Sequence, residues 1–260
     1  MSQTLRPFAD APRDRLARIR LIATDIDGTM TRKGKLNADV LTAIVQLADA
    51  GVEVLPVTGR PAGEALGLAR YLPCVREAIA ENGAVLVRPD QDVITLWNPP
   101  DRALLTRVAA EVAAPNSPLH LAEDAFCRVG DVAFLREGRG DAEIAALAER
   151  GRAHDVFVIW SSVHIHFSLQ SPDKGAAVLS VSAERGVQPD QILTIGDAPN
   201  DVGLWIPGRF GLTVGTADVH SHAAALSHKP EWVCDAKGAD AWLMMAQRVL
   251  QAVTSQTGAG

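Results

Sequence analysis

Two carboxylates that stand two residues apart form the most informative short motif of this chain, DIDGT at residues 25–29. The motif follows a short apolar run, residues 19–24, and Gly28 permits a tight turn after it. Left alone, the carboxylates of Asp25 and Asp27 would repel each other and raise each other's pKa. Magnesium prefers oxygen ligands and binds a few protein carboxylates together with substrate phosphate. The motif therefore predicts a cation site next to a phosphate, although a simple turn flanked by acids would have the same residues.

A second acidic cluster is the hexapeptide GDAPND, whose carboxylates belong to Asp197 and Asp201. It also follows an apolar run, residues 192–195. If the two apolar runs are neighbouring strands of one parallel sheet, both motifs lie at the same edge of that sheet. The carboxylates of Asp25, Asp27, Asp197 and Asp201 would then surround one metal ion.

A cluster of acids also needs positive charge if it is to hold a phosphate. Lys174 stands at a predicted helix start in the segment PDKG, where its ammonium can pair with both Asp25 and a phosphate oxygen. Thr58 follows another apolar run, residues 52–57, and offers a hydroxyl beside backbone N–H groups. We interpret both residues as phosphate contacts; taken alone, Lys174 would equally suit a solvated helix terminus.

These motifs require a scaffold that brings strand ends together. Residues 19–24, 52–57 and 78–79 have the pattern of short buried strands, and residues 38–48 and 64–71 have helical spacing. Alternation of strand and helix predicts right-handed crossovers and a parallel sheet. Ligands of such sheets bind beyond the C-terminal ends of the strands, which is where the polar motifs fall.

The middle of the chain has a different pattern, because strand-like runs outnumber helices and do not alternate with them. The expected strands are residues 85–87 and 92–97, short runs near Phe126 and Phe134, and the run from Val156 to Leu169, with helices at 101–113 and 141–150. We interpret this region as an α+β insertion with a mostly antiparallel sheet.

The α/β pattern returns at Lys174. A helix is expected over residues 174–186, strands over 192–195 and 210–214, and a last amphipathic helix over 239–253. Residues 1–18 are predicted to form an extended arm with one helical turn, and residues 254–260 a disordered tail.

Composition excludes several classes of protein. The 260 residues include 25 Lys and Arg and 31 Asp and Glu, a net charge of −6, which argues against a general binder of nucleic acid or anionic membranes. Three widely separated cysteines favour isolated thiols over a disulfide framework or a zinc site. No run approaches the roughly 20 apolar residues of a membrane span, and the N-terminus lacks a signal-peptide core. We therefore expect a cytoplasmic protein.

Together, DIDGT (25–29), VTGRP (57–61), PDKG (172–175) and GDAPND (196–201) resemble the four motifs of the haloacid dehalogenase (HAD) superfamily of phosphotransferases. ENGA (81–84) further resembles subfamily IIB, which contains Cof-type sugar phosphatases, sucrose-phosphate phosphatase, mannosyl-3-phosphoglycerate phosphatase, archaeal phosphoglycolate phosphatase and phosphomannomutase. The motifs occur in the right order, and as a set they are very specific. The resemblance implies a Mg²⁺-dependent phosphomonoesterase that acts on a small phosphorylated metabolite, a sugar phosphate or a phospho-carboxylic acid.

The resemblance also implies catalytic roles. Asp25 resembles the nucleophile that forms an aspartyl-phosphate, and Asp27 the general acid and base, whose backbone carbonyl also binds Mg²⁺. Asp197 and Asp201 resemble metal ligands, the latter directly or through water.

Five further residues resemble phosphate or substrate contacts of the family. Thr58, Gly59, Lys174 and Asn200 match positions that hold the phosphate or orient the nucleophile, and Asn82 stands at a strand end that should face the insertion. For Asn82 a plain turn is an equally good interpretation.

Motif spacing locates the inserted domain. Only 33 residues separate Asp25 from Thr58, whereas 116 separate Thr58 from Lys174, which leaves room for an insertion of about 85 residues at the position of a C2-type cap. The implied fold class is α/β, a Rossmann-like parallel-sheet core with a smaller inserted α+β cap of the C2B type. We expect residues 1–84 and 171–260 to form the catalytic core and residues 85–170 the cap.

Some residues of the insertion invite functional interpretations of their own. His164 and His166 alternate on one expected strand, and we predict that they face solvent while Ile165 and Phe167 are buried, although metal or phosphate binding is an alternative.

Several arginines are candidates for substrate contacts. Arg60 is either a substrate contact or only a cation at a strand end. The arginines available for a second anionic group of the substrate are Arg128, Arg136 and Arg139.

Two other functions are compatible with the motifs. A phosphomutase would return the phosphoryl group to a sugar, and a non-enzymatic module would only accept phosphate on Asp25, as receiver domains do. The expected partner is a small phosphorylated metabolite rather than nucleic acid or membrane, with the chain acting as a monomer or homodimer.

Overall fold

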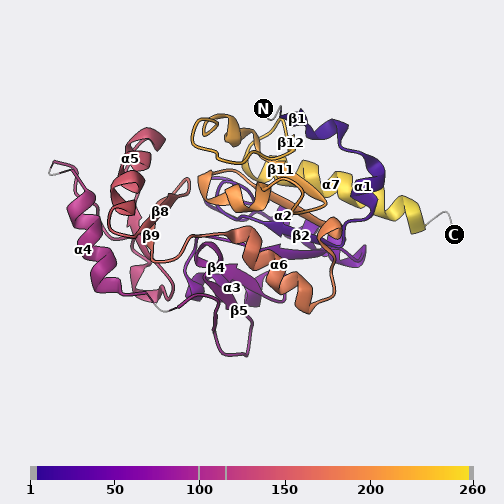
Figure 1. The fold of residues 1–260 in the computed structure, drawn as a ribbon. Coiled ribbons are helices and arrows are strands. Elements are labelled where there is room, and N and C mark those ends of the chain that lie inside the picture. The colour runs from indigo at the N-terminus through magenta and orange to yellow at the C-terminus, as the bar shows by residue number, and fades with distance from the viewer. Residues whose placement is uncertain (1–4, 99, 115, 258–260) are drawn as a thin grey trace.

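The larger layer of the protein is a parallel sheet of six strands in the order β1-β12-β11-β10-β2-β3, seen in a computed structural model that describes residues 5–98, 100–114 and 116–257 (Figure 1). The strands are β1 (Arg6–Pro7), β2 (Leu21–Thr24), β3 (Glu53–Pro56), β10 (Ile192–Gly196), β11 (Leu212–Gly215) and β12 (Trp232–Val233). The predicted α/β class with a parallel sheet is confirmed.

Strand register brings the sequence motifs together. Strand β2 is buried along its whole length and pairs in parallel with β10 on one side and β3 on the other. Thr24 is level with Ile195 and Pro56, so the three strands end side by side. The segments that follow these strands begin with the DIDGT, GDAPND and VTGRP motifs, which consequently share one edge of the sheet.

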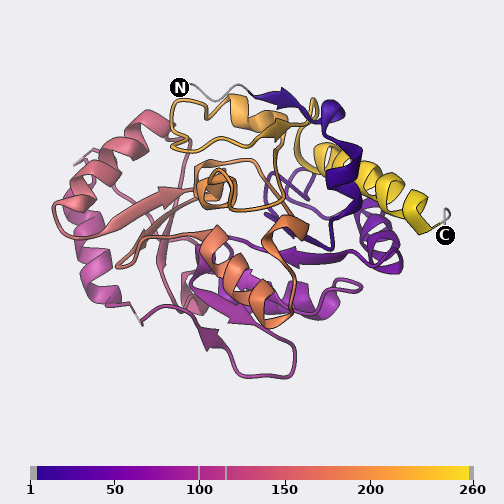
Figure 2. The same cartoon turned by 45° about the vertical axis from the view of Figure 1, so that its right-hand side comes forward.

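Helices cover both faces of this sheet, as the two ribbon views show (Figures 1 and 2). They are α1 (Arg13–Ala17), α2 (Ala38–Asp49), α3 (Ala62–Tyr71), α6 (Lys174–Glu184) and α7 (Gly238–Thr257). Helix α7 extends further than predicted, so the expected disorder of residues 254–257 is wrong; that of residues 258–260 lies outside the described part. The helix is held by a buried face that includes Trp242, Val249 and Val253.

A three-stranded antiparallel sheet leads from the first layer into the insertion. Its order is β4 (Ala78–Ala80), β5 (Val85–Val87) and β6 (Ile94–Thr95), so the strand expected over 92–97 is shorter than predicted. A parallel bridge between Val57 and Ile79 joins β4 to the end of β3. Strand β5 packs in the hydrophobic clusters of the first layer.

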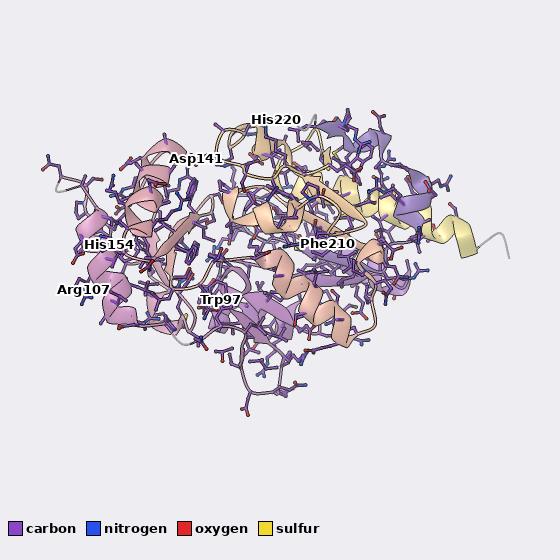
Figure 3. All side chains as sticks on the ribbon, in the orientation of Figure 1. Trp97, Arg107, Asp141, His154, Phe210 and His220 are labelled. Atoms are coloured by element: carbon purple, nitrogen blue, oxygen red, sulfur yellow. The ribbon has the colours of Figure 1, made fainter. Side chains whose placement is uncertain are left out.

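The remaining insertion forms a separate layer with its own hydrophobic cluster, at the left of Figure 1. Its antiparallel sheet has the order β7 (Val132–Leu135), β9 (His164–Ser168) and β8 (Phe157–Trp160), covered by α4 (Arg102–Val112) and α5 (Asp141–Arg152). Arg107 and His154 mark this layer in Figure 3, and Phe210 marks the larger one. The predicted antiparallel α+β insertion is confirmed.

The strand predicted near Phe126 is wrong. Residues Ala125–Cys127 form a 3-10 turn, and the Phe126 side chain is 89% exposed. A strand residue needs pairing partners, whereas this aromatic ring projects from a loop.

None of the described helices is both long enough and apolar enough to cross a bilayer.

Candidate active site

Three aspartates converge at the C-terminal edge of the parallel sheet. Asp25 follows β2, and Asp197 and Asp201 follow the neighbouring strand β10. One carboxylate oxygen from each lies within 4.8 Å of the others, and all three residues are buried. The two acidic motifs therefore meet in space, as their positions after apolar runs predicted.

Lys174 lies between two of these carboxylates. Its Nζ donates to Asp25 Oδ1 and to Asp201 Oδ1, each at 2.6 Å, and the residue is fully buried. Lys174 is the first residue of α6, where Asp173 caps the helix by accepting from the backbone N–H of Ala176 at 3.0 Å. The helix cap therefore fixes the place from which the lysine reaches the acids.

Glycines allow the motif backbones to approach the carboxylates closely. A Cβ atom on Gly28, whose φ is +78°, would lie 2.4 Å from Asp197 Oδ2. A Cβ atom on Gly196 would lie 2.4 Å from Asp201 Oδ2. A side chain at either position would push the neighbouring carboxylate of this cluster out of place.

The charges of this cluster do not balance. Three buried carboxylates face one ammonium, and burial together with the neighbouring acids raises the pKa of Asp197 well above its usual value. Burial likewise raises the pKa of Asp25 to about 7, against the opposing charge of Lys174. A divalent cation among the three oxygens would supply the missing positive charge, and an all-oxygen set suits Mg²⁺.

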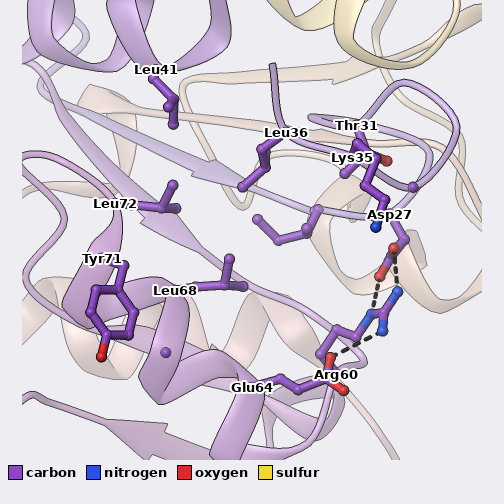
Figure 4. Close-up of a pocket in the computed structure, with 13 residues that line it drawn as sticks. Asp27, Thr31, Lys35, Leu36, Leu41, Arg60, Glu64, Leu68, Tyr71 and Leu72 are labelled. Carbon is purple, nitrogen blue, oxygen red and sulfur yellow. Dashed lines mark hydrogen bonds and ion pairs between the residues drawn. The ribbon is translucent and has the colours of Figure 1, made fainter. Parts of the chain in front are cut away.

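Asp27 is separated from these three carboxylates and is held by Arg60. The guanidinium donates through Nε to Asp27 Oδ2 at 2.6 Å and through Nη2 to Oδ1 at 2.7 Å, and it also contacts Glu64 at 3.0 Å (Figure 4). The two-pronged contact fixes the direction of the Asp27 carboxylate. Of the two roles considered for Arg60, the structure thus shows a partner of Asp27.

An aliphatic cavity of about 520 Å³ adjoins Asp27 on the side of α2 and α3 (Figure 4). The residues that line it include Leu36, Leu41, Leu68 and Leu72. This cavity contains no residue of the inserted layer.

Thr58 and Gly59 follow the strand beside Asp25. Thr58 is 1% exposed, and its Oγ1 accepts from the backbone N–H of Arg60 at 3.0 Å. A Cβ atom on Gly59 would lie 3.1 Å from Asn82 Oδ1 and 3.2 Å from His166 Nε2. Gly59 is therefore the point where the motif backbone meets both Asn82 and the inserted layer.

Asn82 and Asn200 form a buried amide pair. Asn200 Nδ2 donates to Asn82 Oδ1 at 3.0 Å, while Asn82 Nδ2 and Asn200 Oδ1 have no partner among the described residues. Asn82 has a φ of 57°, in the left-handed region, directly after Glu81 at 50°. Two consecutive residues in this sparsely populated conformation, next to unpaired amide atoms, are typical of a functional site.

His164 and His166 are not at a solvent face, so that prediction is wrong. They are 8% and 2% exposed, because β9 is the central strand of its sheet and both of its faces are covered. Ile165 and Phe167 pack in the cluster with α4 and α5, while the histidines face the larger layer, where His166 meets Gly59. His166 Nδ1 lies 2.8 Å from Asp131 Oδ2.

The three insertion arginines are not available for a second anionic group of the substrate, because each already has partners. Arg128 Nη1 donates to Asp131 Oδ1 at 2.9 Å and to Gly59 O at 3.0 Å, and its Nη2 donates to Asp124. The partners of the other two are Asp141 and Ser161 O for Arg136, and Ser117 and Pro118 O for Arg139. Arg128 instead joins the inserted layer to the Gly59 carbonyl.

Glu81 is a residue whose role the sequence did not reveal. Its carboxylate accepts from the backbone N–H groups of Ala62 on α3 and of Val129 and Asp131 in the inserted layer, at 3.0, 2.9 and 3.1 Å. Burial, and then the charge of Asp131, raise the pKa of Glu81. Only its place in the ENGA motif could have drawn attention to it.

Fold and site together define a class of protein: an α/β protein with a cluster of buried carboxylates and a buried lysine at the edge of a parallel sheet. Comparison with known proteins narrows the class. The model of the haloacid dehalogenase-like hydrolase family matches residues 22–124. A phosphoglycolate phosphatase of Pyrobaculum neutrophilum is 31% identical over 214 residues, 79% of this chain and 87% of the relative. One of Methanoculleus marisnigri is 29% identical over 223 residues, 84% and 91% of the two chains. The chain belongs to the haloacid dehalogenase-like hydrolases.

Solved structures share the fold at low sequence identity. A protein of Thermoplasma acidophilum superposes with a TM-score of 0.71 at 18% identity, covering 89% of this chain and 98% of its own. The sucrose-phosphatase of Synechocystis, solved with sucrose and phosphate, gives a TM-score of 0.62 at 17% identity, covering 88% and 97%. Both superpositions extend over most of this chain and nearly all of the neighbour, so the neighbours share its fold.

Proposed function

We propose that this protein is a Mg²⁺-dependent phosphomonoesterase of small phosphorylated metabolites that works through an aspartyl-phosphate. The observation that carries the proposal is the buried cluster of Asp25, Asp197 and Asp201 around the single ammonium of Lys174. Phosphoryl transfer needs little from a protein beyond alignment and neutralisation of charge, and this cluster supplies both.

In the first step, a carboxylate oxygen of Asp25 forms a bond to phosphorus while the bond from phosphorus to the leaving oxygen breaks. Asp27, once protonated, gives its proton to that oxygen, and the alcohol departs. In the second step, Asp27 takes a proton from water, whose oxygen attacks phosphorus and releases phosphate with the Asp25 carboxylate restored. Arg60 orients Asp27 for both transfers.

The remaining residues hold the reacting groups in place. Lys174 would pair with a phosphoryl oxygen as well as with Asp25, and the Thr58 hydroxyl and the backbone of Gly59 would bind the other oxygens. The unpaired amide atoms of Asn82 and Asn200 offer a donor and an acceptor at the same place. Mg²⁺, held by Asp25, Asp197, Asp201 and the Asp27 carbonyl, would neutralise charge on the phosphate.

For the domain organisation, we propose that residues 1–84 and 171–260 form the catalytic core and that residues 85–170 supply the cap. The hairpin of β5 and β6 packs on the core clusters, while α4, α5 and the β7-β9-β8 sheet form the layer that carries His164 and His166 to the site. Cap closure over the substrate would exclude water from the phosphoryl group.

The substrate class is supported by the relatives, whose name gives phosphoglycolate as their substrate. A sugar phosphate or a phospho-carboxylic acid both remain within the proposal. The cytoplasmic location and the monomeric or homodimeric state stay predictions.

A panel of phosphorylated metabolites, assayed with Mg²⁺ for released phosphate, tests the proposal. We expect turnover that Asp25→Asn abolishes, while Asp49→Asn, a matched change of an exposed aspartate on α2, preserves it. An isomerised sugar phosphate without free phosphate would instead identify a phosphomutase. Full turnover by Asp25→Asn would remove the nucleophile assignment.

A further inference from the structure

A cleft of about 420 Å³ opens between the two layers, next to the group that holds Asp27. The core contributes Arg60 and Glu64 to its lining. The inserted layer contributes Glu123, Asp124, Phe126, Leu135, Val163 and His164. Because Arg60 contacts Asp27 directly, a leaving group protonated by Asp27 can extend into this cleft.

The His164 side chain has no hydrogen-bond partner among the described residues. Its side chain is 10% exposed, and its Nδ1 lies 4.0 Å from Asp124 Oδ2, beyond hydrogen-bonding distance. Burial, followed by the charge of His166, lowers the pKa of His164 to about 4. The ring is therefore neutral near pH 7 and has one N–H donor and one acceptor nitrogen. A side chain that lines a cleft and has no hydrogen-bond partner in the protein leaves its hydrogen-bonding capacity available to a ligand there.

The charges of the cleft are unfavourable for a second anionic group. Three carboxylates line it, those of Glu64, Glu123 and Asp124. Arg60 is already paired with Asp27 and Glu64, and the Asp124 carboxylate is paired with the buried Arg128. Among the described lining residues no cation is left without a carboxylate partner, so a substrate carboxylate would be repelled rather than bound.

An apolar platform completes the cleft. The Phe126 ring is 89% exposed, which is a large exposure for an aromatic side chain with no packing partner on the loop that carries it. A ring of this kind can cover the C–H face of a ligand whose hydroxyl groups point the other way.

We propose that this cleft is the leaving-group subsite of the enzyme, and that His164 and Phe126 select a neutral, hydroxyl-bearing leaving group over one that carries a carboxylate. The inference rests on the proposed function and narrows it to the sugar-phosphate class, which sets this chain apart from relatives whose named substrate, phosphoglycolate, carries a carboxylate. A hydroxyl group both donates and accepts, so it satisfies either ring nitrogen of His164, whereas a carboxylate can only accept and meets the negative charge of Glu64 and Glu123.

The test compares three six-carbon phosphomonoesters: D-glucitol 6-phosphate, 6-phosphogluconate and n-hexyl phosphate. The first two differ only in a terminal CH₂OH against a carboxylate, and the third lacks hydroxyl groups. We expect kcat/KM to favour glucitol 6-phosphate over each of the others by about tenfold or more, roughly the effect of one hydrogen bond and one repulsion.

Variants assign the preference to named residues. His164→Phe should lower it several-fold, mainly by raising KM for glucitol 6-phosphate, whereas His164→Gln, which keeps a donor and an acceptor, should retain most of it. Phe126→Ala should weaken it less. Phe157→Ala removes another partly exposed aromatic of the inserted layer that does not line the cleft, and should leave the preference unchanged.

The results distinguish a failure of the proposed subsite from a failure of the proposed function. Equal or faster turnover of 6-phosphogluconate, or a preference unchanged in His164→Phe, would overturn the subsite while leaving the phosphatase intact. Faster turnover of n-hexyl phosphate would overturn it in favour of the aliphatic cavity beside Asp27. Absence of phosphate release from all three and from acetyl phosphate would contradict the proposed function itself.

Discussion

Two clusters of buried carboxylates lie in the region of the candidate active site, each beside one cationic side chain. The pKa values of the two clusters are shifted in opposite directions. At the sheet edge, Lys174 bonds the carboxylates of Asp25 and Asp201, with Asp197 beside them, and burial raises the pKa of Asp25 and of Asp197. In the inserted layer, Asp131 and Asp124 surround Arg128, and despite burial the guanidinium lowers the pKa of both, that of Asp131 to about 2.

The opposite pKa shifts follow from the number of carboxylates around each cation and from the geometry of their contacts. The ammonium of Lys174 is one point charge among three carboxylates, which leaves two negative charges without a partner. Arg128 bonds two carboxylates through separate nitrogens, and Asp131 gains His166 as well. Each carboxylate of the second cluster bonds the guanidinium directly, whereas in the first cluster Asp197 has no cationic partner among the described residues. Buried charge therefore marks a reaction centre only where it is left uncompensated.

The largest effect should come from the reacting carboxylate of the first cluster. Asp25→Asn removes the carboxylate that we propose as the nucleophile, so we expect kcat to fall by roughly 10,000-fold or more. In EDTA the same change removes one of the repelling charges, so the free energy of unfolding should stay the same or rise. Phosphate-release kinetics and urea unfolding measure the two quantities, and a large loss of stability would show that Asp25 is structurally required.

In the second cluster, unlike the first, we expect the loss of a carboxylate to reduce the stability of the protein. Asp131→Asn leaves the buried Arg128 with one carboxylate partner fewer, and we expect a loss of about 3 kcal/mol in the free energy of unfolding. Urea unfolding beside Asp25→Asn provides the comparison. Equal stability of the two variants would end the distinction between a complete and an incomplete cluster.

The first cluster could be predicted from the sequence and the second could not, for a physical reason. Asp25 and Asp197 each follow an apolar run, and the C-terminal ends of parallel strands lie at one edge of the sheet. Local sequence patterns are therefore enough to predict that these two aspartates lie close together. Asp131 and His166 meet through an antiparallel pairing of β7 and β9 inside an insertion, and the orientation of β9 depends on which of its faces packs against the core. Alternation along β9 correctly predicted that Ile165 and His164 lie on opposite faces of the strand. It could not predict that both of these faces are covered.

Acidification should weaken the protein through the histidine beside the second cluster. The pKa of His164 falls from 6.5 to about 4 on folding, so between these values the unfolded chain binds the proton more readily. The free energy of unfolding should therefore decrease as the pH falls from about 6.5 to 4, by about 2 kcal/mol from this residue. The groups that influence it are His166, Asp124, Arg128 and Arg60.

His164→Gln isolates that contribution, because the amide does not titrate in this range. Urea unfolding at pH 7, 6, 5 and 4 should give a shallower acid loss for the variant than for the original chain. Parallel curves would mean that His164 has an ordinary pKa in the folded protein, so that the ring in the proposed subsite would be partly protonated near pH 7.

The smallest expected effect is the gain in stability when a cation binds to the first cluster. Mg²⁺ held by Asp25, Asp197 and Asp201, as we propose, would stabilise only the folded chain, and at ten times its Kd it should add about 1.4 kcal/mol to the free energy of unfolding. Asp197→Asn should lose this gain, whereas Asp131→Asn, although less stable, should keep it, because its cluster is already compensated. Thermal unfolding of the original chain and the two variants, each with Mg²⁺ and with EDTA, measures the three differences. If Asp131→Asn also lost the response, cation binding would depend on the inserted layer, and the two clusters would have to be treated as one coupled site.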